Sequence, residues 1–279
     1  MKYRHLYHAG NFADVHKHVT LLAALGALKR KEKGFLYFET HAGRGVYDLA
    51  DSAAESRHGI GRLVGTECAA APLRRYLMLL EQLRVGRGRS RLYPGSPWLA
   101  VSELRAQDRA VFVESVPEEA RALERALSGA GAVRIRAEVG DGFEKLRSVL
   151  PPPQGRALTL IDPPYEDTRR DFERTSAAVA DAIKRFPTGV VAVWYPVKVA
   201  RDTERWLDGM ARRITRAMLT AELRLYPADS RVALNGSGML IINPPYQLDV
   251  ELAESLAELY GRLAVGPGGG IIVQPREAR

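Results

Sequence analysis

Four residues, Asp162-Pro163-Pro164-Tyr165, directly follow the apolar run Leu158–Ile161. Prolines cannot donate ladder hydrogen bonds, so this pair ends a strand, stiffens the loop and holds the preceding residue extended. The loop therefore fixes the direction of the Asp162 carboxylate and of nearby backbone carbonyls. We expect it to project Tyr165 as a flat aromatic surface at the carboxyl end of a sheet, where α/β folds bind their ligands.

Such a site suits methylation of an exocyclic amine. An aryl amine is a poor nucleophile because its lone pair is delocalised into the ring. Acceptors on its N–H groups favour pyramidalisation and take up the departing proton. An aromatic face stacked on the base contributes about 1–3 kcal/mol, which offsets part of the cost of unstacking the base. Taken alone, the motif also fits a rigid strand-end turn that has no chemical role.

A second copy of the pattern, Asn243-Pro244-Pro245-Tyr246, follows another apolar run. Position along the chain separates the two copies. Methyltransferase sheets carry the target-amine motif at the end of the fourth strand, and Asp162 ends the fourth strand predicted here. Asn243 ends a late strand, after a predicted hairpin. We therefore expect Asp162 to belong to the catalytic copy.

The elements that must position these residues alternate between short apolar strands and amphipathic helices. Strands are predicted at 35–38, 110–114, 133–136, 158–161, 190–194 and 239–242, and helices at 14–33, 117–128, 167–186 and 198–213. Alternation of this kind predicts crossover units and a parallel sheet with helices on both faces. Near the end of the chain, 214–226 and 236–242 could pair antiparallel, and the glycine-rich segment 266–270 leads to a short final strand or a tail.

Residues 51–95 interrupt the alternation. They contain no convincing strand, a helical run over 71–84 and an arginine-rich stretch over 86–91. We interpret the segment as a small helical insertion after the first strand. It either contacts substrate or is a solvated cap.

Three further positions favour a cofactor site. Residues 39–45 form a glycine-bearing turn after the first strand, although the spacing is not that of a dinucleotide-binding loop. Glu114 ends the second strand, where an acidic group could hold ribose hydroxyls. Asp141-Gly142 follows the third strand and opens a helix, where Asp141 could also be only an N-cap. Their order along the chain, followed by the Pro-Pro motif after the fourth strand, makes the pattern informative.

The N-terminal segment holds four of the six histidines: His5, His8, His16 and His18. These could ligate a metal, but no cysteine joins them and no HExxH pattern is present, so no metal is expected. The aromatic and basic side chains of Tyr3, Arg4 and Lys17 suit contacts with bases and phosphates, or a solvated arm.

The segment Tyr93–Pro97 reads as a rigid turn that enters a helix. Ser96 is a natural N-cap there, with Pro97 at the first helical position.

Composition limits the class of protein. The chain has 279 residues, 46% hydrophobic and 27% charged, with a net charge of +8 and a pI near 9.7. The basic excess favours a polyanionic partner. A lone cysteine, Cys68, excludes a disulfide framework. No apolar run approaches the length of a membrane span, and no signal peptide is recognisable, so a cytoplasmic protein without membrane association is expected.

Together these segments resemble the bacterial RlmJ family of 23S rRNA adenine-N6 methyltransferases. The segments that carry the resemblance are Tyr3-Arg4-His5, His8-Ala9-Gly10-Asn11, Ala13-Asp14, Lys17-His18, Thr40-His41-Ala42-Gly43, Tyr93-Pro94-Gly95-Ser96-Pro97, Asp141-Gly142-Phe143, Ile161–Glu166, Trp194-Tyr195-Pro196, Ser237-Gly238-Met239 and Asn243-Pro244-Pro245. Tyr246 departs from the family, which can carry Trp there, and residues 51–92 match poorly.

The resemblance implies an α/β fold: a Rossmann-like class I S-adenosylmethionine-dependent methyltransferase. It would be a single domain over 1–279 with an inserted helical subdomain over 51–95. It implies S-adenosyl-L-methionine as methyl donor without a metal, adenine 2030 of 23S rRNA as target, and a monomer. By position, His18, His41, Ser96, Glu114, Asp141, Gly142 and Asp162 match the family's cofactor-contacting residues. Asp162 also matches its catalytic acceptor, and Tyr3 a residue that meets the RNA.

The expected reaction is direct transfer. Tyr165 would pack on an unstacked adenine, while Asp162 and a carbonyl near Pro163 accept hydrogen bonds from N6, so that the site acts mainly by positioning. Arg4, Lys17 and the basic residues of 84–91 would hold phosphates, which predicts salt-sensitive RNA binding. A methyltransferase for DNA adenine or a protein amide, or a non-catalytic RNA-binding protein, remain as alternatives.

Overall fold

The computed structural model describes residues 8–50, 53–129, 133–227, 230, 232 and 234–277. Tyr3, Arg4 and His5 lie outside the described residues. Within these ranges no helix is both long enough and apolar enough to cross a lipid bilayer.

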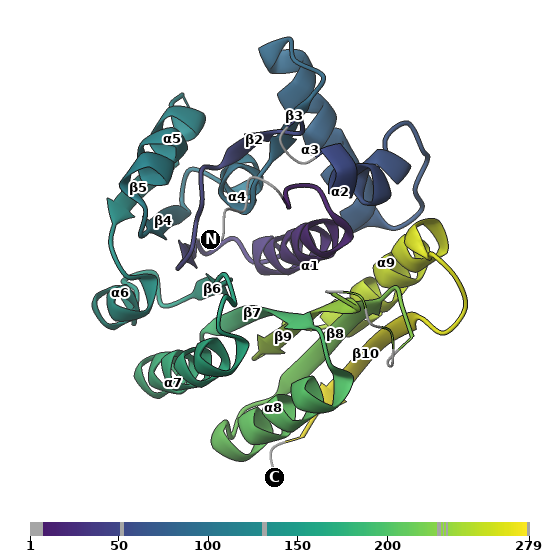
Figure 1. Ribbon diagram of the computed structural model, residues 1–279. Helices are drawn as coiled ribbons and strands as arrows, with labels where there is room; N and C mark the ends of the chain where they lie inside the picture. Colours follow the sequence, from purple (N-terminus) through teal and green to yellow (C-terminus); the bar gives the residue numbers. More distant parts are fainter. Residues whose placement is uncertain are drawn as a thin grey trace.

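An eight-stranded sheet forms the centre of the molecule, with strand order β10-β8-β9-β7-β6-β1-β4-β5 (Figure 1). Its strands are β1 (Leu36–Glu39), β4 (Arg109–Glu114), β5 (Arg134–Val139), β6 (Ala157–Ile161), β7 (Val190–Val197), β8 (Met218–Arg224), β9 (Gly236–Ile242) and β10 (Gly270–Arg276). The five strands from β7 to β5 are parallel, and β9, β8 and β10 extend the sheet antiparallel. The parallel order is that of a Rossmann-like methyltransferase sheet, and the predicted antiparallel pair near the end of the chain is confirmed.

Helices cover both faces of the sheet, as predicted. They are α1 (Phe12–Lys29), α2 (Ala53–His58), the short 3-10 helix η2 (Ile60–Arg62), α3 (Ala71–Arg87), α4 (Ser96–Glu103), α5 (Pro117–Leu127), α6 (Gly142–Val149), α7 (Thr168–Arg185), α8 (Ala200–Arg213) and α9 (Leu248–Leu263). Helices α1, α3, α4, α5 and α9 lie on one face, and α6, α7 and α8 on the other (Figure 1).

Alternation along each strand divides the apolar core between the two faces. In β9, Met239 and Ile241 pack under α1 and α9, whereas Leu240 and Ile242 pack against the layer of α7 and α8. Successive side chains of a strand point to opposite faces, so a strand buried on both faces reads as one continuous apolar run. This is why the central strands were predictable from short apolar runs.

The segment after β1 contains one element that the sequence did not reveal. A small two-stranded sheet pairs β2 (Val46–Asp48) antiparallel with β3 (Leu92–Pro94), so the prediction of no strand within 51–95 is wrong. Each strand has only three residues, and β3 contains a proline. Neither strand is long enough to show an alternating hydrophobic pattern, and each is stabilised by its pairing with the other. The predicted helix of this segment is α3, and α2 and η2 precede it.

Candidate active site

The carboxyl ends of β1, β4, β5 and β6 meet at one edge of the sheet, and the predicted site residues Glu114, Asp141 and Asp162 lie there. The loops are joined directly: Thr40 N donates to Leu160 O at 3.1 Å, and Ala42 N donates to Val113 O at 2.9 Å. Gly142 lies so close to the carbonyl of Thr40 that an added Cβ would be 1.9 Å from its oxygen. Only glycine fits at that position, so the third loop can close on the first.

Asp162 is held by a buried lysine. Lys17 Nζ lies 2.6 Å from Asp162 Oδ2 and 2.9 Å from Asp14 Oδ1, with the Lys17 side chain only 6% exposed. Burial lowers the pKa of Lys17, but the carboxylates of Asp14 and Asp162 outweigh it and hold this pKa well above 10.5. Lys17 is thus a permanent cation of the site. Lys17 was predicted to hold RNA phosphates; in the structure its ammonium group is held by these two carboxylates.

Glu39, the last residue of β1, is fully buried beside this pair. It accepts hydrogen bonds from the hydroxyls of Tyr37, at 2.8 Å, and Ser96. Burial raises the pKa of Glu39 to about 8, although these hydrogen bonds and the charge of Lys17 act to lower it. Ser96 was predicted to be the N-cap of α4, and this is wrong. Gly95 occupies that position, and Ser96 is the first helical residue. Its hydroxyl bonds to Glu39 instead.

His18 lies on α1 one residue after Lys17 and is completely buried. Its Nδ1 lies 3.1 Å from the hydroxyl of Tyr93, which in turn accepts a hydrogen bond from Tyr76 at 2.8 Å. Its Nε2 is 3.5 Å from Asp14 Oδ1. The polar residues of this part of α1 therefore form the floor of the site, not a solvated arm.

His41, in the loop after β1, lies under the edge of Phe143 with the ring centroids 4.9 Å apart. Burial lowers the pKa of His41 to about 4. The ring is neutral at pH 7; its Nδ1 lies 2.8 Å from the hydroxyl of Thr40, so Nε2 is the nitrogen that can meet a ligand.

The acidic residues after β4 and β5 shape the neighbouring loops. Glu114 accepts hydrogen bonds from the backbone of Gly43 at 2.8 Å and of Val116 at 2.8 Å. Asp141 is the N-cap of α6, accepting from Phe143 N at 2.8 Å, and it pairs with Arg174 at 2.8 Å. The capping interpretation of Asp141 is thus confirmed, and it leaves the second carboxylate oxygen beside an arginine.

Tyr165 differs from its expected arrangement. Its side chain is 3% exposed, its hydroxyl donates to Trp194 O at 2.8 Å, and its ring packs edge-on against Phe172 and Trp194. The prediction of a freely projecting aromatic surface is therefore wrong for this structure. Its φ of +50° is a left-handed conformation that costs a bulky residue energy and is typical of functional loops. Pro163 is buried and Pro164 exposed.

The second Pro-Pro motif lies at the opposite edge of the sheet. Strand β9 runs antiparallel to β7 and pairs Ile242 with Val191, so its carboxyl end lies where the parallel strands begin. Asn243 donates to Pro187 O at 2.9 Å and to Gly189 O at 2.8 Å, which fixes a turn there. Strand direction therefore removes Asn243 from the site, in agreement with the choice of Asp162.

A hydrogen-bonded chain behind the Tyr165 loop was not predicted. Trp194, whose carbonyl accepts from Tyr165, donates its indole N–H to Ser237 Oγ at 2.9 Å, and Ser237 Oγ lies 2.8 Å from His16 Nδ1. Burial lowers the pKa of His16 to about 3, so the ring is neutral. No local sequence signal distinguished His16 from the polar residues that surround it on α1.

The remaining described histidine of the N-terminal segment, His8, pairs with Glu55 on α2 at 2.9 Å. Among the residues that the structure describes, no three His, Cys, Asp or Glu side chains are grouped closely enough to hold a metal ion.

Comparison with known proteins shows extensive similarity. The family model described as "Ribosomal RNA large subunit methyltransferase D, RlmJ" matches residues 32–274. Two proteins named "Ribosomal RNA large subunit methyltransferase J" are similar over nearly their whole length. The one from Haemophilus influenzae is 38% identical over 263 residues, covering 93% of this chain and 92% of the relative. The one from Escherichia coli is 37% identical over 267 residues, covering 94% of each.

A solved structure agrees with these sequence matches. The crystal structure of protein LPL1258 from Legionella pneumophila has a TM-score of 0.87 and 35% sequence identity, and the match covers 96% of this chain and 98% of that one.

Proposed function

This chain belongs to the RlmJ family of ribosomal RNA large subunit methyltransferases, and on that basis we propose that it methylates N6 of one adenine, adenine 2030, in 23S rRNA. The methyl donor is S-adenosylmethionine. The observation that supports the choice of an amine target is Asp162. It ends β6 at the carboxyl edge, in an Asp-Pro-Pro-Tyr loop, with its carboxylate held 2.6 Å from a buried lysine.

The residues at this edge fit the methyl donor. S-adenosylmethionine carries ribose hydroxyls, an adenine and two cationic groups, the ammonium and the sulfonium. Glu114 ends β4, where a carboxylate can accept from ribose hydroxyls. Asp141 and Gly142 open α6 beside it, and neutral His41, in the loop after β1, packs against Phe143 of α6. The carboxylates of Asp162 and Asp14 give the floor of the site the negative groups that a cation needs nearby.

We assign different roles to the other two cofactor residues of the family pattern. His18 and Ser96 bond to Tyr93 and Glu39 and are 0% and 5% exposed. Their side chains shape the floor of the cofactor site by fixing these buried partners. The residues that make direct polar contacts with S-adenosylmethionine are then His41, Glu114, Asp141, Gly142 and Asp162.

The chain's own groups then act mainly on the amine. When bound, S-adenosylmethionine supplies an electrophilic methyl group. Asp162 accepts a hydrogen bond from N6 of adenine, and the backbone carbonyl near Pro163 accepts the second. These two bonds localise the lone pair on nitrogen and orient it in line with the methyl group. Lys17 fixes the carboxylate of Asp162 through the 2.6 Å contact, so the acceptor is positioned before the substrate arrives.

Tyr165 supports this loop from within. Its ring is buried and its hydroxyl is bound to Trp194, so stacking on the adenine would require that hydrogen bond to break. We therefore assign Tyr165 the positioning of the Pro163-Pro164 turn, with the exposed Pro164 ring as the apolar surface nearest to the base.

The test is transfer of a labelled methyl group to unmethylated 23S rRNA, with duplex DNA in parallel. Label should appear as N6-methyladenine in rRNA alone. Asp162→Asn keeps the size of the side chain but weakens the acceptor, so kcat should fall by about 10²–10⁴-fold. Asn243→Gly, in the motif at the opposite edge, is the matched control and should keep the wild-type kcat.

Label on DNA or protein without label on rRNA would refute the substrate. Equal loss of activity in the two variants would refute the assignment of Asp162. Binding of rRNA without any transfer by the wild-type chain would support the non-catalytic alternative.

A further inference from the structure

The inserted segment carries an unusual share of the molecule's charge. Residues 51–95 contain eight arginines, no lysine and four acidic residues, so they account for half of the net charge of +8. Four of these arginines, Arg84, Arg87, Arg89 and Arg91, fall within eight residues that contain no acidic side chain. Arginine is the residue best suited to phosphate because its planar fork donates two parallel hydrogen bonds.

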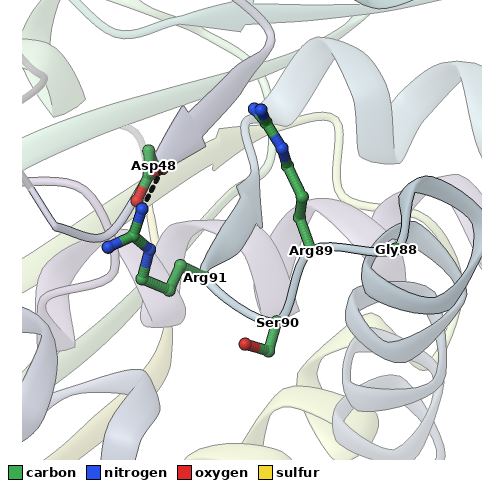
Figure 2. A pocket seen from close by; sticks show the side chains of 5 residues that line it. All are labelled: Asp48, Gly88, Arg89, Ser90 and Arg91. Carbon is green, nitrogen blue, oxygen red and sulfur yellow. Dashed lines mark hydrogen bonds and ion pairs between the residues drawn. The ribbon is translucent and has the colours of Figure 1, made fainter.

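The structure separates these four arginines into two pairs. Arg84 Nε donates to Leu92 O at 3.1 Å, and Arg87 Nη2 donates to Ala126 O at 2.8 Å. The Arg84 side chain is therefore bound to the start of β3, and the Arg87 side chain to the neighbouring helix α5. Arg89 and Arg91 are exposed and line a shallow pocket of about 310 Å³ together with Asp48, Gly88 and Ser90 (Figure 2).

The backbone of this pocket is fixed. Gly88 ends α3 in a left-handed conformation, with φ of +60°, and Arg89 N donates to Arg84 O at 3.0 Å. On the other side, Leu49 N donates to Arg91 O at 2.9 Å, which joins the turn to β2. Arg89 and Arg91 both extend toward the side on which Asp48 lies, whereas Ser90 points away (Figure 2). The two guanidinium groups are thus presented from a rigid turn, which reduces the entropy lost when they bind a ligand.

The only carboxylate among the pocket's lining residues holds one arginine weakly. Arg91 lies 3.3 Å from Asp48, with the two side chains 69% and 32% exposed. Exposed ion pairs of this kind contribute about 0–1 kcal/mol, so an incoming phosphate can take over the guanidinium at little cost.

The pocket is connected to the candidate active site by the ribbon β2–β3. Strand β3 leads from Arg91 to Gly95 and Ser96, and Gly95 N donates to Gly45 O at 2.8 Å in the loop after β1. At the rise of an extended strand, Arg91 and Ser96 are roughly 15 Å apart. An RNA strand whose adenine occupies the site can span this distance with a few nucleotides.

From these observations we propose that the pocket of Arg89 and Arg91 binds the phosphodiester backbone of the RNA substrate beside the target adenine. The inference rests on the proposed function for the identity of the RNA. It adds a second contact region, on the inserted segment, that carries affinity and takes no part in methyl transfer.

The test measures binding of unmethylated 23S rRNA as a function of salt. The variant is Arg89→Gln/Arg91→Gln. The matched control is Arg212→Gln/Arg213→Gln, which removes two exposed arginines at the end of α8, on the opposite side of the molecule (Figure 1). In the pocket variant, Kd at about 0.1 M salt should rise roughly tenfold, and the slope of log Kd against log salt should fall by about 1.4–1.8. Both quantities should stay at the wild-type value in the control.

Methyl transfer gives a second readout. At saturating RNA, kcat and the affinity for S-adenosylmethionine should be unchanged in the pocket variant, and KM for RNA should rise. A fall of kcat with unchanged RNA affinity would overturn the proposal, because the arginines would then act through the structure of the site. Equal loss of affinity in the control would overturn it too, since net charge alone would explain the effect.

A third variant changes the sign of the effect. Asp48→Asn removes the competing carboxylate, so RNA should bind severalfold more tightly. A loss of affinity as large as that of the pocket variant would refute phosphate binding and show that Asp48 and Arg91 serve the turn.

These outcomes are distinguishable from failure of the proposed function. A chain that binds RNA through the pocket but transfers no methyl group overturns the proposed function and keeps this inference. If all variants methylate 23S rRNA with the same KM, the proposed function is kept and this inference is overturned.

Discussion

Two carboxyl groups of the site, those of Asp162 and Glu39, have different surroundings. Asp162 faces the cation of Lys17 at 2.6 Å, and Glu39 accepts from two neutral hydroxyl groups. Asp162 is thereby paired with a positive charge, whereas Glu39 is surrounded by uncharged hydroxyl donors. The pKa of Glu39, raised to about 8, follows from this difference, because two hydroxyl groups do not replace the water lost on burial.

A stability test follows from Glu39. The unfolded chain releases this proton near pH 4.5, and the folded chain holds it up to about pH 8. The folded state therefore binds more protons in this window, and the free energy of unfolding should fall as pH rises through it, by up to about 1.4 kcal/mol per pH unit. Glu39→Gln lacks the titrating group and should show a smaller decline in urea unfolding measured between these pH values.

The control is Glu118→Gln, which removes an exposed carboxyl group on α5 and should keep the wild-type pH dependence. Parallel curves for wild type and Glu39→Gln would show that Glu39 is already ionised in the folded state.

Residue roles were the part least accessible from sequence. Asp162, Glu114 and Asp141 were found because strand ends can be predicted, and strand ends meet at one edge. Lys17 was predicted to hold phosphates because the N-terminal segment, which includes Asp14, His16 and Lys17, mixes aromatic and basic side chains. The structure buries all three, since α1 is enclosed on several sides. Ser96 was misassigned because a serine before a proline fits a cap equally well.

At the scale of elements, α1 and β9 join the site to the rest of the fold. Ser237 in β9 accepts from the indole of Trp194, lies 2.8 Å from His16 and donates to Ala13 O at 3.4 Å. A single hydroxyl thus links β9 to β7 and to α1. Because Trp194 also holds Tyr165, this link reaches the Asp-Pro-Pro-Tyr loop.

Ser237→Ala should lower the free energy of unfolding by about 1–3 kcal/mol, because it leaves buried polar groups of His16 and Trp194 without this partner. It should also reduce kcat severalfold through the Tyr165 loop. Ser255→Ala is the matched control: this serine is equally buried, but its hydroxyl bonds only to Glu251 O of its own helix, at 2.7 Å. Urea unfolding and steady-state transfer measure both effects. Equal destabilisation by the two substitutions would refute the proposed link.

Prediction of elements succeeded where a local pattern existed. The apolar runs that became β1, β4, β6 and β7 were recognisable because both faces of each strand are buried. The ribbon β2–β3 was missed, since three-residue strands have no period to detect. The direction of β9 could be inferred only from a predicted hairpin, and this direction separates the two Pro-Pro motifs.

At the scale of the whole molecule, stability and chemistry have different locations. Strand β10 lies at the far edge of the sheet, on the side away from β1 and β4. Arg276 in β10 pairs with Glu204 at 2.8 Å and with Asp208 at 3.1 Å, both on α8, and its side chain is 9% exposed. These ion pairs connect β10 to α8, in the helix layer that also contains α6 and α7.

Arg276→Met keeps the apolar length of the side chain and removes the charge. Two ion pairs are lost, to carboxylates whose side chains are 51% and 28% exposed, so the free energy of unfolding should fall by about 1 kcal/mol. The kcat for rRNA should remain at the wild-type value when measured well below the unfolding temperature. A fall in kcat at that temperature would show that the far edge is coupled to the site.

The enclosure of α1 has a consequence for how the protein is made. This helix supplies Lys17 near the start of the chain, yet it packs against β9 and α9, which lie close to the end. Contacts so distant in sequence form late in folding. During translation, α1 cannot acquire its final surroundings until Leu248–Leu263 has been synthesised. The amine-binding loop and its lysine are therefore assembled only after α9 has been synthesised, so a shorter nascent fragment attached to a ribosome has no complete site with which to modify that ribosome's RNA.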